Sequence, residues 1–190
     1  LSEIKDLIDK ATFTYVRQKQ MLGLGHAILT GEPLIGNEPF AVILADDLCD
    51  CADKNVLSQM IEVYEKYKCS IIAIEEIPIS DSEKYGIVNG ELVENSKNII
   101  KVNNMVEKPR PENALSNFAI IGRYILTPDI FEILKTIKPG NNGEVQITDA
   151  LMIQAQKGKV IAFKFNGKRF DCGSVEGFLD ATNYFAQKLI

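Results

Sequence analysis

The sequence predicts a three-layer α/β domain whose sheet is largely parallel in its first half and mixed in its second. Phe40–Leu44 and Cys69–Ile74 are short apolar runs, typical of strands buried on both faces. Val56–Tyr67, between them, has near-helical apolar periodicity, so the three segments predict a βαβ unit with a right-handed crossover. After Pro78 the segments become shorter, and Asn89-Gly90 is the strongest hairpin signal in the chain.

The segments before the first buried strand are predicted from caps, periodicity and turn residues. We expect a surface helix at Leu1–Lys10, a short strand at Thr12–Val16, a helix from about Leu24 to Thr30 and a loop at Pro33–Pro39. We interpret His26 as a structural histidine. Gly23 and Gly25 allow a tight turn or a close approach to a ligand, and the pair alone does not decide which.

The second half alternates strands and helices without a repeat or a linker, so residues 1–190 are expected to form a single domain. Patterns of β-prone residues, N-caps and turn residues predict these elements in order: a strand at Ile99–Glu107, a rigid loop at Lys108–Pro111, a core strand at Asn117–Leu126, a helix from Thr127-Pro128 through Leu134, a helix at Glu144–Gln156, a strand at Val160–Phe165, a short strand at Lys168–Cys172 and a helix at Val175–Leu189.

Composition excludes several classes of protein. The chain is 46% hydrophobic and 25% charged, as expected of a soluble globular protein, and its net charge of −5 argues against a nucleic-acid partner. Its apolar runs are all shorter than the roughly 18 residues that a membrane span needs. The four cysteines follow no zinc-binding spacing, which favours reduced thiols and a cytoplasmic location.

Asp46 and Asp47 follow the first buried strand directly, at the end where ligands bind in open α/β sheets. Adjacent carboxylates repel, and Mg²⁺ would relieve them because it prefers oxygen ligands. A polar turn in which an Asp caps the next helix fits the stretch equally well. Glu107, Lys108 and Asp171 also fall at predicted strand ends, so we expect these side chains to cluster with the pair.

A set of short motifs runs through the chain in a fixed order: Val16-Arg17-Gln18, Gly23-Leu24-Gly25-His26-Ala27, Leu44-Ala45-Asp46-Asp47, Lys84-Tyr85-Gly86, Val106-Glu107-Lys108-Pro109, Ser116-Asn117, Ile121-Gly122-Arg123-Tyr124, Gly143-Glu144-Val145-Gln146-Ile147-Thr148-Asp149 and Asp171-Cys172-Gly173. Each motif alone is unspecific. The ordered set resembles the bacterial UTP–glucose-1-phosphate uridylyltransferases, also called UDP-glucose pyrophosphorylases, over essentially all 190 residues.

The resemblance implies a nucleotide-diphospho-sugar transferase fold, which is Rossmann-like, with a mixed, mostly parallel sheet. That family opens with a strand and a loop of the form G-x-G-T-R-x-x-P, which grips the triphosphate, and the chain contains no such loop. We therefore expect the N-terminal part to be absent and the chain to be the later part of the catalytic domain. Ala45 also stands where many relatives have Pro.

The implied reaction joins UTP and glucose 1-phosphate into UDP-glucose and pyrophosphate, by Mg²⁺-assisted in-line attack on the α-phosphate. The resemblance makes Asp46 the principal Mg²⁺ ligand and Asp171 the second, with Asp47 in a capping or supporting role. Lys108 would contact the sugar phosphate, and Glu107 would accept hydrogen bonds from sugar hydroxyls.

The remaining implied contacts concern the sugar and the base. Gly86 would let the backbone approach the sugar, and Asn117 and Gln146 would line its pocket. Gln18 would read the uracil edge, and Gly23 would let the base pack against the backbone. The family also implies a homo-oligomer that supplies glucosyl units for envelope polysaccharides.

Two alternatives stay open. A related sugar-phosphate nucleotidyltransferase could use dTTP, because a Gln18 carboxamide serves uracil and thymine alike. A fragment without the triphosphate loop could instead bind a sugar nucleotide weakly, without catalysis.

Overall fold

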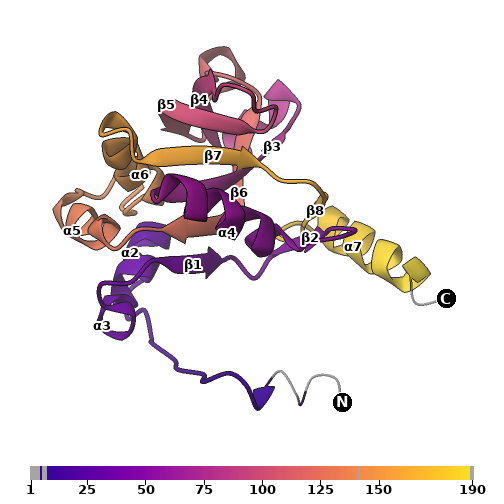
Figure 1. Cartoon of the computed structure of the whole chain (residues 1–190), viewed down its shortest axis with the longest axis horizontal. Helices are drawn as coiled ribbons and strands as arrows, with labels where there is room; N and C mark the ends of the chain where they lie inside the picture. The colour runs from indigo at the N-terminus through magenta and orange to yellow at the C-terminus, as the bar shows by residue number, and fades with distance from the viewer. Residues whose placement is uncertain (1–4, 6–7, 141, 189–190) are drawn as a thin grey trace.

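The computed structural model describes residues 5, 8–140 and 142–188. The predicted helix at Leu1–Lys10 lies largely outside these residues. A six-stranded sheet forms the middle layer, with α4 (Val56–Tyr67) against one face and α2 (Gly23–Thr30), α5 (Asp129–Thr136) and α6 (Ile147–Gln156) against the other (Figure 1). The prediction of three layers is therefore confirmed.

The main sheet has the strand order β1-β6-β3-β7-β5-β4, and β4 also pairs with the start of β6. Its strands agree with the predicted segments to within a few residues at most ends: β1 (Phe40–Ile43), β3 (Ser70–Glu76), β4 (Gly86–Leu92), β5 (Ile99–Glu107), β6 (Phe118–Leu126) and β7 (Val160–Lys164).

The sheet is mixed, as predicted, but it is not mostly parallel. Among the described strands, only β3 and β7 are parallel neighbours. The βαβ unit is present, because β1 and β3 both run antiparallel to β6 and therefore run in the same direction. β6 lies between them, and its insertion makes this part of the sheet antiparallel. Apolar runs mark strands covered on both faces, and a three-layer fold covers antiparallel strands as well.

The core divides into two clusters, one on each face of the sheet. Along β3, Ile71 and Ala73 pack toward α4, whereas Ile72 and Ile74 pack toward the layer that contains α5 and α6. Side chains of a strand alternate between its two faces, so an unbroken apolar run fills both clusters.

The first strand differs most from its prediction. Among the described strands, β1 lies at the edge of the sheet and pairs only with β6, and Ile43 is 55% exposed. One face is covered, since the ring of Phe40 stacks on Phe131 of α5 with centroids 5.0 Å apart. The opposite face of β1 lies outside the area that α4 covers, because α4 packs on β3, β6 and β7.

Two turn and strand predictions are wrong. Thr12–Val16 forms no strand and is exposed, because β-prone residues need a partner strand and the described part of the chain supplies none. Asn89-Gly90 lies inside β4 as an irregularity in its pairing with β5, so the hairpin turn falls later, between Leu92 and Ile99. A glycine inside a strand often marks such a bulge.

One loop prediction and one helix boundary also change. The one-turn helix α3 (Glu32–Ile35) occupies the start of the loop predicted at Pro33–Pro39. α6 begins three residues later than predicted, because Val145 is bound on both sides by the chain that enters α2. Its N–H donates to Leu22 O at 2.7 Å, and its carbonyl accepts from Gly25 N at 2.9 Å.

A second, two-stranded sheet extends from the main one. β2 (Asp47–Asp50) pairs antiparallel with β8 (Lys168–Asp171), and α7 (Val175–Lys188) follows β8 and projects from this side of the molecule (Figure 1). Because β2 begins at Asp47, the aspartate pair caps no helix, and that alternative is excluded. Within the residues that the structure describes, no helix has the length and apolar character needed to cross a membrane.

Candidate active site

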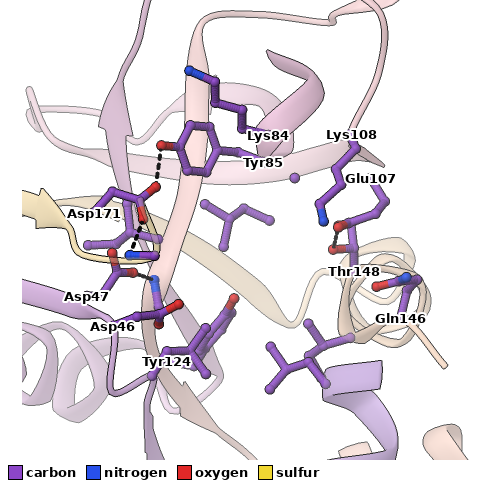
Figure 2. Close-up of a pocket in the computed structure, with 18 of the residues that line it drawn as sticks. Asp46, Asp47, Lys84, Tyr85, Glu107, Lys108, Tyr124, Gln146, Thr148 and Asp171 are labelled. Carbon is purple, nitrogen blue, oxygen red and sulfur yellow. Dashed lines mark hydrogen bonds between the residues drawn. The ribbon is translucent and has the colours of Figure 1, made fainter. Parts of the chain in front are cut away.

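A cavity of about 570 Å³ opens between the main sheet and the β2–β8 sheet. Two polar groups face each other across it: the aspartates 46, 47 and 171 on one side, and Glu107, Lys108, Thr148 and Gln146 on the other (Figure 2). These residues come from the β1–β2 turn, the end of β5, the start of α6 and the end of β8. The fold thus gathers at one place the strand-end residues that the sequence predicted to cluster.

The β1–β2 turn fixes the two aspartates in different environments. The Asp47 carboxylate is buried and accepts hydrogen bonds from Gly122 N and Arg169 Nε. The Arg123 guanidinium donates to Leu44 O at 3.0 Å and to Asp47 O, so it ties down both ends of the turn. The neighbouring Asp46 side chain remains exposed and lines the cavity. Asp47 therefore supports the turn, and Asp46 is available to a ligand.

Asp46 and Asp171 flank one small space above Gly173. A β-carbon at position 173 would lie 3.1 Å from Asp171 Oδ1 and 3.3 Å from Asp46 Oδ2. The backbone holds the two loops together, because Cys172 N donates to Asp46 O at 2.8 Å. Two carboxylates that lie this close together fit a hard divalent cation such as Mg²⁺, which takes its other ligands from water and substrate phosphates. Among the described residues no third His, Cys, Asp or Glu joins them.

The Asp171 carboxylate is held in its ionised form. Burial would raise its pKa, but the hydrogen bond from Tyr85 and the charge of Arg169 outweigh burial and lower the pKa below its usual value. Tyr85 Oη donates to Asp171 Oδ2 at 2.6 Å, and Gly173 N donates to Oδ1 at 3.1 Å. Because it is charged at neutral pH, Asp171 can act as a cation ligand without losing a proton.

Glu107 occupies the opposite side of the cavity. Thr148 Oγ1, at the start of α6, donates to Glu107 Oε2 at 2.5 Å and fixes the carboxylate. Gly86 lies directly beneath: a β-carbon there would be 3.2 Å from both Glu107 Oε2 and Thr148 Oγ1, and 3.1 Å from Ile120 Cδ1. A side chain at position 86 would therefore displace the carboxylate, so this glycine is needed for close approach.

Lys108 sits in an unusual backbone conformation. Its φ is 45°, in the left-handed region, and its N–H donates to Tyr85 O at 3.0 Å. Non-glycine residues in this region cost roughly 1–3 kcal/mol and concentrate at functional sites. Lys84 also lines the cavity but is paired with Asp81 at 2.9 Å. Within the described residues Lys108 forms no such ion pair, so its ammonium is the one available to an anionic ligand.

Gln18 is held beside the cavity rather than in its lining. Its Nε2 donates to Gly23 O at 3.1 Å and lies 2.9 Å from His26 Nδ1. Gly23 lines the cavity with φ at 86°, and a β-carbon there would lie 2.8 Å from Glu144 Cβ. His26 is thus structural, as expected, and it acts directly on the orientation of the Gln18 carboxamide.

The predicted sugar contacts are only partly brought together. Gln146 lines the cavity, where its Nε2 donates to Glu144 Oε2 at 2.8 Å. Asn117 is exposed just before β6 and is not part of the lining, since the cavity meets β6 only from Ile120 onward. The predicted contact between Asn117 and the sugar therefore stays a prediction.

Sequence reasoning missed several polar residues of the cavity, among them Tyr85, Thr148 and Arg169. Tyr85 and Thr148 lie inside the motifs that carry the family resemblance, which was the available signal. Arg169 lies two residues before Asp171, so the alternation of a strand places both side chains on one face of β8. That spacing signals the contact only once Asp171 is already known as a site residue.

Comparison with known families identifies the class of protein to which this fold and site belong. Residues 2–188 match the family model for nucleotidyl transferases, and the chain belongs to that family. It is 59% identical over 187 residues to a UTP–glucose-1-phosphate uridylyltransferase of Pseudomonas aeruginosa, covering 98% of this chain and 66% of the relative. It is 43% identical over 188 residues to the Staphylococcus epidermidis enzyme of that name, covering 99% of this chain and 64% of the relative. The chain thus spans slightly less than two thirds of these relatives.

Solved structures agree with this assignment. A UDP-glucose pyrophosphorylase complexed with UDP-glucose superposes with a TM-score of 0.94 at 58% identity, covering 98% of this chain and 71% of that one. The UTP-bound enzyme of Acinetobacter baumannii superposes with a TM-score of 0.80 at 34% identity, covering 97% of this chain and 66% of that one. The nucleotide-diphospho-sugar transferase fold expected from the resemblance is confirmed.

Proposed function

We propose that the protein is a UTP–glucose-1-phosphate uridylyltransferase, which forms UDP-glucose and pyrophosphate from UTP and glucose 1-phosphate. The observation that carries this proposal is the single cavity in which the Asp46–Asp171 pair faces Glu107 and Lys108. In this proposal the acidic side would bind the cation, and the side with Lys108 would bind the sugar phosphate. The names of the close relatives supply the choice of substrates.

The acidic side would hold Mg²⁺ through Asp46 and Asp171. When bound, Mg²⁺ neutralises charge on the triphosphate as pyrophosphate leaves. The protein's own contribution is to place two anions close together: Lys108 binds the sugar phosphate whose oxygen attacks the α-phosphorus, and Glu107 accepts from sugar hydroxyls. Thr148 keeps Glu107 in place, and the bare backbone at Gly86 lets the sugar approach.

Gln18 would select the base through one hydrogen-bond acceptor, its side-chain oxygen. Its Nε2 contacts Gly23 O and His26 Nδ1, so both N–H bonds of the carboxamide are used when His26 carries its proton on Nε2. Its Oε1 has no donor among the described residues and would accept from the N3–H of uracil or thymine. Cytosine carries a lone pair at N3 instead of a proton, so this arrangement disfavours CTP.

The proposed activity is tested by pyrophosphate release from UTP, dTTP, CTP and GTP, with glucose 1-phosphate and Mg²⁺ present, in the protein at its full natural length. We expect UTP to give the highest kcat/KM. CTP and GTP should fall by about 100-fold, since an unpaired buried polar contact costs a few kcal/mol. A strong preference for dTTP would contradict the UTP assignment and support the related thymidylyl-transferring alternative.

The alternative of binding without catalysis has its own test. UDP-glucose is titrated calorimetrically into the 190-residue chain with and without Mg²⁺, and turnover is measured on the same sample. Mg²⁺-dependent binding without turnover would support a non-catalytic sugar-nucleotide binder. Absence of binding here, together with binding by a longer chain, would support the fragment hypothesis.

Gly86→Ala is expected to raise the KM for glucose 1-phosphate by about 10-fold, because overpacking at this position costs about 1–3 kcal/mol. The added methyl group would press on Glu107 Oε2 and Thr148 Oγ1. Steady-state kinetics with each substrate varied in turn provides the measurement. Gly140→Ala is the matched control, because a β-carbon there meets only atoms at 3.6 and 3.8 Å. An equal rise in the KM for UTP would contradict the sugar-side assignment.

A cytoplasmic location and self-association belong to the same proposal. All four cysteines are free thiols, as expected in a reducing compartment. The homo-oligomer implied by the family resemblance stays a prediction, which light scattering of the purified protein would test.

A further inference from the structure

Arg169 contributes a buried guanidinium to the lining of the cavity, and its side chain is only 6% exposed. It pairs with three carboxylates: Asp47 through Nε, Glu75 through Nη1 at 2.5 Å, and Asp171 through Nη2 at 3.3 Å. The ring of Tyr85 lies against it, with the centroid 5.0 Å from Cζ. A buried charge is tolerated only where such partners satisfy it.

The register of the β2–β8 sheet explains why a positively charged side chain is needed beside Asp47 and Asp171. Asp47 and Asp171 are direct cross-strand partners on β2 and β8. Like charges placed directly opposite each other destabilise an antiparallel pair. Arg169 emerges on the same face of β8, two residues before Asp171, and contacts both carboxylates. It therefore removes the repulsion that would otherwise push Asp171 out of position.

The two oxygens of Asp171 have separate surroundings. Oδ2 is held by Arg169 Nη2 and Tyr85 Oη. Oδ1 accepts from Gly173 N and borders the space that it shares with Asp46 Oδ2. Holding one oxygen fixes the direction of the other.

We propose that Arg169 is a positioning residue for the divalent cation: by neutralising Asp47 and anchoring Asp171 Oδ2, it aims Asp171 Oδ1 at the space beside Asp46. This inference rests on the proposed function and extends it to a residue outside the ligand set. Arg169 itself would contact neither the metal nor the substrate.

The test measures Mn²⁺ binding directly, by the loss of the free-ion electron paramagnetic resonance signal, with and without UDP-glucose. Arg169→Met keeps most of the side-chain volume and removes the charge. We expect its Mn²⁺ affinity to fall about 10- to 100-fold, the usual loss when a residue that orients a metal ligand is removed. The Mg²⁺ concentration for half-maximal turnover should rise by a similar factor, and kcat at saturating Mg²⁺ should recover much of its normal value.

Glu75→Gln is the matched control. It removes another ion pair of the same guanidinium, but Glu75 does not line the cavity. Its Mn²⁺ affinity should stay within about threefold of the wild type. The double variant Arg169→Met with Asp47→Asn should regain at least part of the lost affinity, because the repulsion across the two strands is gone.

A shift in Glu75→Gln as large as that in Arg169→Met would overturn the proposal, because the effect would then reflect general loss of stability. Unchanged Mn²⁺ affinity in Arg169→Met, or no Mn²⁺ binding by the wild type in either condition, would also overturn it. If Arg169→Met does not fold, Tyr85→Phe removes the second anchor of Oδ2 and should weaken Mn²⁺ by about 3- to 10-fold; no change would contradict the anchoring role. Since Mn²⁺ binding needs no turnover, a failed uridylyltransferase assay would leave this result readable.

Discussion

Replacing Asp46 with Asn should lower kcat/KM about 1000-fold while the protein remains folded. The metal contributes several kcal/mol of transition-state stabilisation in such reactions, and a neutral amide at position 46 would lose most of it. Asp46 is exposed, and its carboxylate borders the same space as that of Asp171. The measurement is pyrophosphate release by the protein at its full natural length, over a range of Mg²⁺ concentrations. An unchanged rate would exclude a metal-binding role for Asp46.

Thermal unfolding separates loss of the metal from loss of the fold. Without Mg²⁺, Asp46→Asn should unfold at the wild-type temperature or slightly above it, because one of two neighbouring carboxylates has been neutralised. With Mg²⁺ and UDP-glucose, only the wild type should gain stability, since ligands stabilise the state that binds them. Asp53→Asn provides the control, because it makes the same chemical change at an exposed position outside the cavity.

The positions of most strands and helices could be predicted because local patterns determine them. β5 occupies the predicted residues 99–107, and α4 the predicted residues 56–67. Strand direction could not be predicted in the same way, because an apolar run records coverage of both faces and not the direction of its neighbours. The insertion of β6 between β1 and β3 depends on contacts between segments about 40 to 85 residues apart, for which the local pattern carries no signal.

The candidate site was also predicted in part. Asp46, Glu107, Lys108 and Asp171 lie at strand ends, and the structure brings them into one cavity. Asp46 and Asp171 come together because Asp47 and Asp171 are paired in a second sheet, which the sequence did not predict. The different environments of Asp46 and Asp47 follow from that pairing, because β2 turns the second carboxylate toward Gly122 and Arg169. The supporting role of Tyr85 could not be predicted in this way, because it depends on the contact between its hydroxyl group and Asp171.

Lys108→Ala should raise the KM for glucose 1-phosphate about 10- to 100-fold and change the KM for UTP by less than about threefold. A hydrogen bond to a charged group is worth roughly 1.5–3 kcal/mol, which converts to this range. The geometry supports a specific contact, because the left-handed backbone at Lys108 and the bond from its N–H to Tyr85 O fix the direction in which the chain presents its side chain. Initial rates with each substrate varied in turn measure the two KM values separately.

The comparison with Lys101→Ala decides whether charge alone explains the result. Lys101 is an exposed residue of β5 and lies outside the cavity, so its loss removes the same net charge without a contact. A long-range effect would lower activity in both variants and would fade with added salt, because exposed charges are screened beyond about 8–10 Å. A direct contact should affect Lys108→Ala alone and persist at higher ionic strength. If UTP binding is instead the weakened step, Lys108 contacts the triphosphate, and the sugar phosphate must be bound by another cation of the cavity. Lys84 would have to leave its ion pair with Asp81 to take that role.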